Sequence, residues 1–227
     1  MALGGRRPAP GSMGCCGIGH LSGRRGDHFI GTPATDLKQR HSNLHCCMDN
    51  EGIFMERFTK AIKMAIENKN WYGALTMALA LPDICGHIEA PKQGSKDRYV
   101  DWYNRYMLKK YTSYLGPDKE EHIFLRGEDC YALRCSYLHQ GGSNIENQKA
   151  RQALSDFLFI GPPESGGLIH LNQFNKALQL QVDIFCLDMA NSVEEWAKIE
   201  VQNNEEYQNK INSELIVIHD GSKGLSF

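Results

Sequence analysis

The chain of 227 residues lacks the features that mark several large classes of protein. It has no run of the roughly 18 to 20 apolar residues that a membrane-spanning helix needs, and no signal peptide opens it, so we expect no membrane association. Its 25 Lys and Arg residues nearly balance 27 Asp and Glu residues, so no bulk positive charge indicates nucleic-acid binding. With 41% hydrophobic and 23% charged residues, the composition is that of a globular protein.

Signatures of metal and cofactor sites are also missing. The sequence has no phosphate-binding glycine loop followed by Lys-Ser/Thr, no G-x-S-x-G turn and no H-E-x-x-H pair. Two pairs of adjacent cysteines occur, Cys15-Cys16 and Cys46-Cys47, but zinc sites usually take spaced cysteines whose sulfurs turn toward one ion. Eight cysteines without an export signal indicate reduced thiols. We therefore expect a cytoplasmic protein with no cofactor and no metal.

Residues 1–47 differ from the rest of the chain in composition. They contain nine of the 22 glycines, half of the eight cysteines and a single aromatic residue, Phe29. Six basic and two acidic residues give this segment a charge of +4, which leaves −6 for the remainder. It shows no apolar period that would bury surface on folding, and it lacks the amphipathic run of a transit peptide. We predict a disordered or non-native leader over 1–47 and one folded domain over 48–227.

Helical spacing of apolar residues begins near Ile53 and predicts a mainly α fold, a helical bundle with a small β-hairpin appendage. Predicted helices run from about 53 to 67, from 71 to 81, around 99–107 and from about 128 to 140, and a long one covers 182–197. Pro82 and Gly86 mark the end of the second helix, and Ser95 is the predicted N-cap of the third. The hairpin is predicted at about 156–171, and residues 215–218 form a third strand or an extended tail.

One compact polar motif stands out in the helix predicted at 128–140. Arg134 and His139 lie five residues apart, which is about 7.5 Å of rise and roughly 140° of turn on an α-helix. The two side chains converge on one phosphate only if His139 sits at a fraying helix end, which Gly141 and Gly142 would allow. Arginine offers a permanent planar charge for a phosphodiester, and histidine can exchange a proton near neutral pH.

This motif resembles the Arg-x(4–6)-His motif of the HEPN superfamily, and the surrounding residues 127–141 look like the motif helix of its small bacterial members. The superfamily comprises helical-bundle ribonucleases and nucleotide-binding proteins, common among toxins and anti-phage defence systems. The resemblance covers roughly residues 53–200 and implies metal-independent RNA cleavage by a dimer in which Arg134 and His139 are catalytic. The position after the arginine is often polar in the family, whereas Cys135 stands here, and this departure bears on catalytic competence.

Three further residues are predicted to orient or support the motif: Asp83, Glu128 and Tyr137. In a purely structural interpretation, Arg134 pairs across the bundle with one of the acidic residues Asp83, Glu128 or Asp101.

Two classes of function follow from the sequence. The first is a metal-independent endoribonuclease, in a toxin or defence role, that leaves a 2′,3′-cyclic phosphate. The alternative is a non-catalytic module that binds a nucleotide or a protein such as an antitoxin. A single imidazole cannot be base and acid at once, so we expect a homodimer with two facing motifs. The predicted contacts are the aromatic residues 102–106 and the side chains of Tyr131 and Leu138 on the motif helix.

Overall fold

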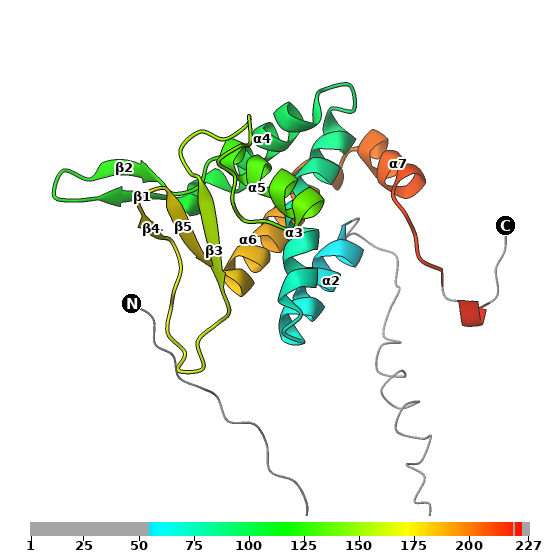
Figure 1. The fold of residues 1–227 in the computed structure, drawn as a ribbon. Coiled ribbons are helices and arrows are strands. Elements are labelled where there is room, and N and C mark those ends of the chain that lie inside the picture. Colours follow the sequence, from blue (N-terminus) through cyan, green and yellow to red (C-terminus); the bar gives the residue numbers. More distant parts are fainter. Residues whose placement is uncertain (1–54, 220, 224–227) are drawn as a thin grey trace, which may run out of the picture. The chain divides into compact units, whose positions relative to one another are not determined.

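The computed structural model describes residues 55–219 and 221–223, which belong to one compact unit, and the fold is mainly α (Figure 1). The leader predicted for 1–47, with its two cysteine pairs, lies outside the described residues. No helix in the described part of the chain is long and apolar enough to cross a membrane. The described α-helices are α2 (Glu56–Glu67), α3 (Trp71–Glu89), α4 (Ser95–Tyr106), α5 (Gly127–Gln140), α6 (Val182–Trp196) and α7 (Glu205–Glu214).

Helix α3 is the central helix of the bundle and packs against α2, α4, α5 and α6. Its predicted end at Pro82 is wrong, because the helix continues to Glu89 with Pro82 fully enclosed in it. A proline inside a helix costs about 3 kcal/mol through a lost hydrogen bond and a steric clash. Nine buried residues along α3 offset that cost, since a helix that is apolar on most sides is stabilised by the packing around it.

Helix α4 begins one residue earlier than its predicted cap implies. Gly94 is the N-cap, and Ser95 is already in the helix, where its hydroxyl donates a hydrogen bond to the carboxylate of Asp83. Trp102 and Tyr103 are fully buried, and Tyr106 packs against the core. The rings of Trp102 and Tyr103 already fill the space between α4 and its neighbours, so they do not form the surface of a dimer contact, and the homodimer itself stays a prediction.

The β-structure differs from the predicted hairpin at 156–171. Strand β3 (Asp156–Ile160) lies within that range but pairs in parallel with β5 (Ala177–Gln181), and β5 pairs antiparallel with β4 (Asn172–Phe174). The order β3-β5-β4 makes β5 the central strand, where Leu178 and Leu180 are buried at a period of two. Residues 168–171 form no strand, since Leu168 is exposed and Leu171 has a left-handed backbone with φ of 57°.

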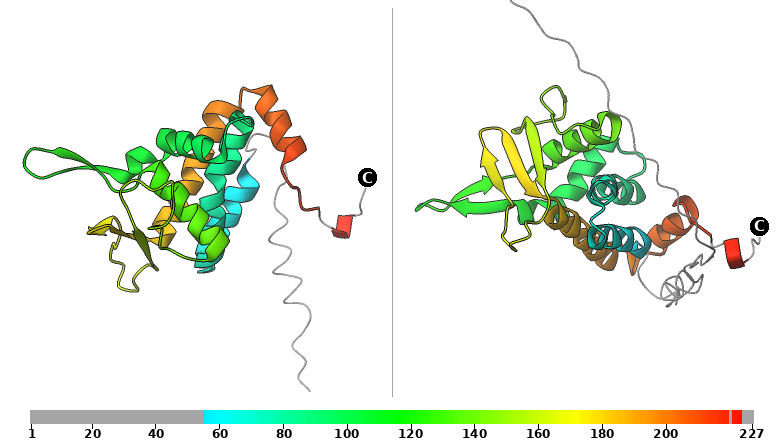
Figure 2. Two further views of the ribbon diagram at one scale, coloured as in Figure 1. Left: turned by 45° about the horizontal axis from the view of Figure 1, so that its top comes forward. Right: turned by 60° about the horizontal axis from the view of Figure 1, so that its bottom comes forward.

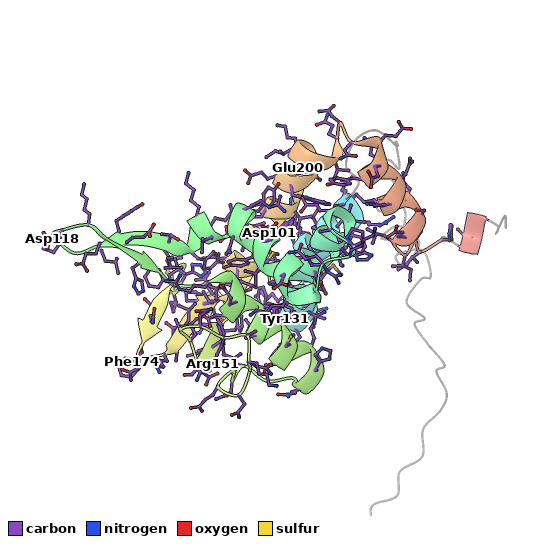
Figure 3. The ribbon with its side chains drawn as sticks, turned by 90° about the horizontal axis from the view of Figure 1, so that it is seen from above. Asp101, Asp118, Tyr131, Arg151, Phe174 and Glu200 are labelled. Atoms are coloured by element: carbon purple, nitrogen blue, oxygen red, sulfur yellow. The ribbon has the colours of Figure 1, made fainter. Side chains whose placement is uncertain are left out.

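A second β element was not predicted. Strands β1 (Thr112–Leu115) and β2 (Glu120–Ile123) form an antiparallel hairpin that extends away from the helices in both views of Figure 2. Asp118 is labelled at its tip in Figure 3. Its strands carry few apolar residues, so the period of two that indicates a half-buried strand is weak here.

Short irregular helices complete the fold. A 3₁₀ turn (Leu108–Tyr111) links α4 to β1, a π-helical turn (Ala197–Val201) extends α6, and a second 3₁₀ turn covers Gly221–Lys223. The predicted third strand at 215–218 is not formed; after a bend at Leu215 these residues follow α7 without regular secondary structure, and Ile216 and Ile218 are exposed. The segment is therefore a tail, as in the alternative prediction, and not a strand of the sheet.

Candidate functional site

Two glycines bring α3, α4 and α5 close together beside the motif. A Cβ atom on Gly86 of α3 would lie 2.8 Å from the backbone oxygen of Arg98 in α4. A Cβ atom on Gly127, at the start of α5, would lie 3.2 Å from the backbone oxygen of Val100. Gly86 was predicted to mark the end of a helix, but its role is to let α4 approach α3. This approach places side chains from three helices within hydrogen-bonding distance.

Asp83 of α3 is the centre of this three-helix contact. Its carboxylate accepts hydrogen bonds from Arg98 Nε at 2.8 Å, from Arg134 Nη2 at 3.1 Å and from Ser95 Oγ at 3.1 Å. Asp83 is only 14% exposed and Arg134 only 19%. The predicted proximity of Asp83 to the motif is therefore present in the structure. Arg98 and Ser95, the other two partners, were not predicted.

The charges of this cluster do not cancel. Two guanidinium groups share one carboxylate, which leaves an excess of one positive charge near the surface of α5. Arg134 uses Nη2 on Asp83. Among the described residues, its buried Nε has no hydrogen-bond partner and Nη1 has only the Cys135 sulfur at 4.0 Å. Its Cζ lies 6.0 Å from the centre of the Tyr131 ring. Arg134 is thus held in place by Asp83, and its Nη1 is only weakly engaged.

His139 has a different environment. It lies in the last turn of α5, is exposed, and makes no hydrogen bond or ion pair within the described part of the chain. The helix does not fray there, because it continues through Gln140 and ends at Gly141, whose left-handed backbone has φ of 69°. The glycine stop matches the prediction, whereas the fraying end that would let His139 join Arg134 is not formed.

Arg134 and His139 therefore lie on two flanks of one helix face. With the helix regular between them, they are separated by about 140° around the axis and about 7.5 Å along it. Tyr131, Cys135 and Leu138 occupy the face between the flanks, and all three are partly exposed. The opposite face of α5 is buried, including Ala132 and Leu133.

The other two predicted supporting residues form no hydrogen bond or ion pair with the Arg134 side chain. Tyr137 donates a hydrogen bond from its hydroxyl to the backbone oxygen of Tyr72 at 3.4 Å, which ties α5 to the start of α3. Glu128, in the first turn of α5, is partly exposed and forms no side-chain hydrogen bond within the described residues. The structure thus brings only Asp83, of the three, to the motif.

Asp129, next to Glu128, is the acidic residue that sequence analysis missed. It is fully buried, and its carboxylate accepts hydrogen bonds from the backbone nitrogens of Gln152 at 2.6 Å and Ala153 at 3.1 Å. Two helical turns on, the Ser136 hydroxyl donates to the backbone oxygen of Asn144 at 2.8 Å. These contacts fasten the loop between α5 and β3 to the motif helix, because a buried carboxylate needs such partners.

An open depression of about 570 Å³ lies between that loop, the motif helix and the start of α4. Figure 3 labels Tyr131 on the helix and Arg151 in the loop. Burial raises the pKa of the Tyr131 phenol, so its hydroxyl stays protonated. The wall of the depression is formed by Lys96, Tyr131, Gln140, Asn147, Gln148, Lys149 and Ala150.

The buried cysteines of the bundle are not nucleophiles. Burial raises the pKa of both Cys130 and Cys186 to about 12, so their thiols stay protonated at neutral pH. Cys135 is the one partly exposed cysteine among the described residues. Within residues 55–219 and 221–223, no group of three or more His, Cys, Asp or Glu residues is arranged to hold a metal ion.

Comparisons with protein-family models, with curated proteins and with solved structures find no match to this chain.

Proposed function

We propose that this protein is a metal-independent endoribonuclease of HEPN type that acts as a homodimer through Arg134 and His139. The observation that carries this proposal is the arrangement on α5: an arginine anchored by Asp83, and a histidine whose side chain has no partner among the described residues, border the same partly exposed helix face. An anchored guanidinium suits a group that stabilises charge on a phosphate. An unengaged imidazole suits a group that must reach a proton on the substrate.

The proposed reaction needs no cofactor. His139 accepts the proton of a ribose 2′-hydroxyl, and the 2′ oxygen forms a bond to the adjacent phosphorus. The bond from phosphorus to the 5′ oxygen breaks, and that oxygen takes a proton from a second imidazole. The products are a 2′,3′-cyclic phosphate and a free 5′-hydroxyl. Arg134 stabilises the negative charge that develops on the phosphate oxygens.

A dimer follows from the separation of the two residues within one chain. A phosphate beside Arg134 faces away from His139 of the same chain, since the two flanks are about 140° apart. A second copy packed on the face of Tyr131, Cys135 and Leu138 would supply its own imidazole, and two-fold pairing is the commonest form of oligomer. The two facing motifs together supply the two imidazoles, one as base and one as acid, that the reaction requires.

The second candidate function is a non-catalytic module that binds a nucleotide or a protein partner. The ion pair of Arg134 with Asp83 favours this alternative, because Arg134 is only 19% exposed and already has an anionic partner. In this case, Arg134 is a structural residue of the bundle and α5 is a docking surface. The two candidates differ in whether substitution of His139 removes an activity on RNA.

Incubation of total RNA with the full chain in EDTA separates the two. We expect cleavage products that end in 2′,3′-cyclic phosphates, and a decrease of about 100-fold or more in rate for His139→Ala, in line with the loss of a general base. A matched control is His122→Ala, since His122 contacts Gln173 on the β-structure, away from α5. No cleavage by wild type, or cleavage of DNA at a similar rate, would contradict the proposal.

Mixing two inactive variants tests the composite site. A mixture of His139→Ala and Arg134→Ala chains forms heterodimers in which one chain supplies an intact Arg134 and the other an intact His139. Such a dimer lacks the second imidazole, so we expect the mixture to regain only a small part of the wild-type rate, below the limit of about a quarter that random subunit exchange would give if a site needed one arginine and one histidine alone. A mixture no more active than its components would contradict a site shared between the two chains.

A further inference from the structure

We infer that the depression beside the motif helix binds an unpaired nucleotide of single-stranded RNA, next to the phosphate that is cut. This inference rests on the proposed function and adds a substrate subsite to it. The depression lies between the start of α4, helix α5 and the loop 144–153. Its wall joins the motif at Tyr131, whose ring also contacts Arg134.

The charge of the depression suits a phosphate backbone. Lys96 and Lys149 are exposed on its wall, neither forms an ion pair within the described residues, and no lining residue is acidic. The neighbouring cluster of Arg98, Arg134 and Asp83 adds a further net positive charge. Local positive charge of this kind is conspicuous in a chain whose net charge is −2. It attracts a polyanion by releasing the counterions of its phosphates.

The uncharged polar residues suit the edge of a base. Gln140, Asn147 and Gln148 line the depression, and none of their side-chain amides has a hydrogen-bond partner in the described part of the chain. Each amide carries both a donor and an acceptor, as the Watson–Crick edge of a base does. Sequence-specific proteins read RNA mostly through such contacts to unstacked bases, which single strands provide and duplexes hide.

The buried carboxylate of Asp129 shapes the depression, because it holds the loop wall against α5. A fully buried carboxylate costs several kcal/mol to desolvate, and Asp129 recovers this cost only by accepting from two loop nitrogens. Arg151 fixes the same loop by donating from Nε to the backbone oxygen of Glu146 at 2.8 Å. The backbone that carries Asn147, Gln148 and Lys149 is therefore held in place, which lowers the backbone entropy lost on binding a ligand.

The size of the depression fits a nucleotide beside a cut phosphate. Tyr131 and Gln140 are nine positions apart on α5, which is about 13.5 Å along the axis and about half a turn around it. The depression therefore curves around the C-terminal part of α5, and Arg134 and His139 lie between its two ends in sequence. A strand that runs between these ends meets the lysines and the amides while one of its phosphates is beside the motif.

The first test measures binding of a fluorescent 2′-O-methyl oligoribonucleotide, which has no free 2′-hydroxyl and cannot be cut. We expect Lys96→Ala/Lys149→Ala to bind about tenfold more weakly than wild type, and the slope of log affinity against log salt to become shallower by about 1.4, the value for two lost phosphate contacts. The matched control is Lys60→Ala/Lys109→Ala, two exposed lysines elsewhere that also lack ion pairs. Equal weakening by both pairs would overturn the inference.

The second test separates base contacts from charge. We expect wild type to prefer one of four homopolymeric 2′-O-methyl probes, and Gln140→Ala/Asn147→Ala/Gln148→Ala to lose that preference with an unchanged salt slope, because only the amides contact bases. Asp129→Asn should weaken the preference as well, since it releases the loop. Circular dichroism checks that each variant is folded. A preference that survives in the triple variant would overturn the inference.

Failure of this inference can be distinguished from failure of the proposed function. If the lysine and amide variants cut total RNA at the wild-type positions and rate while His139→Ala does not, the subsite is wrong and the nuclease stands. If wild type cuts no RNA but the probes bind with the expected dependence on Lys96 and Lys149, the nuclease is wrong and the subsite stands.

Discussion

The two flanks of helix α5 are built in opposite ways. On one flank, Arg134 is mostly buried and shares the carboxylate of Asp83 with Arg98, so its position is fixed by three helices. On the other flank, His139 is exposed and contacts no other side chain through a hydrogen bond within the described residues. Within five residues of one helix, the environment thus changes from a mostly buried ion-pair cluster at Arg134 to solvent at His139.

This difference indicates how the work of the site is divided. A group that stabilises charge is most effective when it is held in advance, because no reorganisation is then needed as the charge develops. A proton-transfer group must instead reach the substrate, and its final position can be set by a partner or by the substrate itself. The arginine flank is therefore expected to matter for stability as well as function, and the histidine flank for function alone.

Removal of Asp83 gives the largest effect on stability. Asp83→Ala leaves the guanidinium groups of Arg98 and Arg134 close together without a counterion, in a place that is mostly shielded from water. Loss of one partner from a buried pair costs about 3–5 kcal/mol, and the partial exposure here lowers the expected decrease in unfolding free energy to about 2–4 kcal/mol. Urea denaturation of wild type and variant measures this difference.

Asp83→Asn is the matched variant, because it keeps the size and the hydrogen-bond acceptor but removes the charge. We expect it to lie between wild type and Asp83→Ala, and addition of Arg98→Met to Asp83→Ala to recover part of the lost stability by removing one unpaired cation. If Asp83→Ala unfolds within about 0.5 kcal/mol of wild type, as ordinary surface variants do, the contrast between the two flanks is wrong.

The helical part of this contrast was accessible from the sequence. Helix α5 was predicted to within one residue at its start and at its end, because the acidic first turn and the stop at Gly141 are local signals. Asp83 was predicted as a neighbour of the motif, and the structure places it there. Local patterns were therefore enough to predict the bounds of the motif helix and to name Asp83 as one candidate for its acidic partner.

Long-range contacts were not accessible in the same way. Arg98 reaches Asp83 only because Gly86 lets α4 approach α3, and a glycine in a helical segment looked like a helix end. Asp129 binds loop nitrogens 23 and 24 residues away, and no spacing in the sequence signals such a contact. The parallel pairing of β3 with β5 was missed because a hairpin between adjacent runs is the simpler interpretation of two short apolar segments.

A second histidine of the described chain offers the opposite environment to that of His139. His170 is half-buried; its Nδ1 accepts from the backbone nitrogen of Gln181, and its ring packs against Tyr111. Burial lowers its pKa below the ordinary value of 6.5, although the nearby carboxylates of Asp188 and Asp183 oppose that shift. The folded protein therefore keeps His170 neutral where the unfolded chain would protonate it.

The sign of the pH dependence follows from that shift. His170 contributes stability above about pH 6.5, and the contribution is lost as pH falls through 6.5 toward its folded pKa. Burial raises the pKa of Asp188 above its ordinary value of 3.8, although the positive charge of Lys110 opposes this shift. A raised carboxyl pKa adds stability as pH falls, which is opposite in sign to the effect of His170, and it does so in a pH range closer to 3.8. We expect the His170 contribution to make wild type less stable as pH falls below about 6.5.

The variant His170→Gln isolates this contribution. Glutamine keeps an acceptor for the Gln181 nitrogen but does not titrate, so its unfolding free energy should fall less than that of wild type over the same interval. Urea denaturation at several pH values measures both curves, with His139→Gln as the control at an exposed site. Parallel curves for wild type and His170→Gln would show that burial of His170 has no influence on stability.

The smallest expected effect on stability is that of His139→Ala, and it gives the sharpest test of the contrast. The side chain is exposed and forms no hydrogen bond within the described chain, so its removal should change the unfolding free energy by less than about 0.5 kcal/mol. Alanine has the higher helix propensity, which favours a small increase rather than a decrease. Measured beside the RNA cleavage assay, the variant should thus be as stable as wild type and inactive. A loss above about 1 kcal/mol would mean that His139 is a structural residue of the bundle, and that its flank of α5 resembles the arginine flank after all.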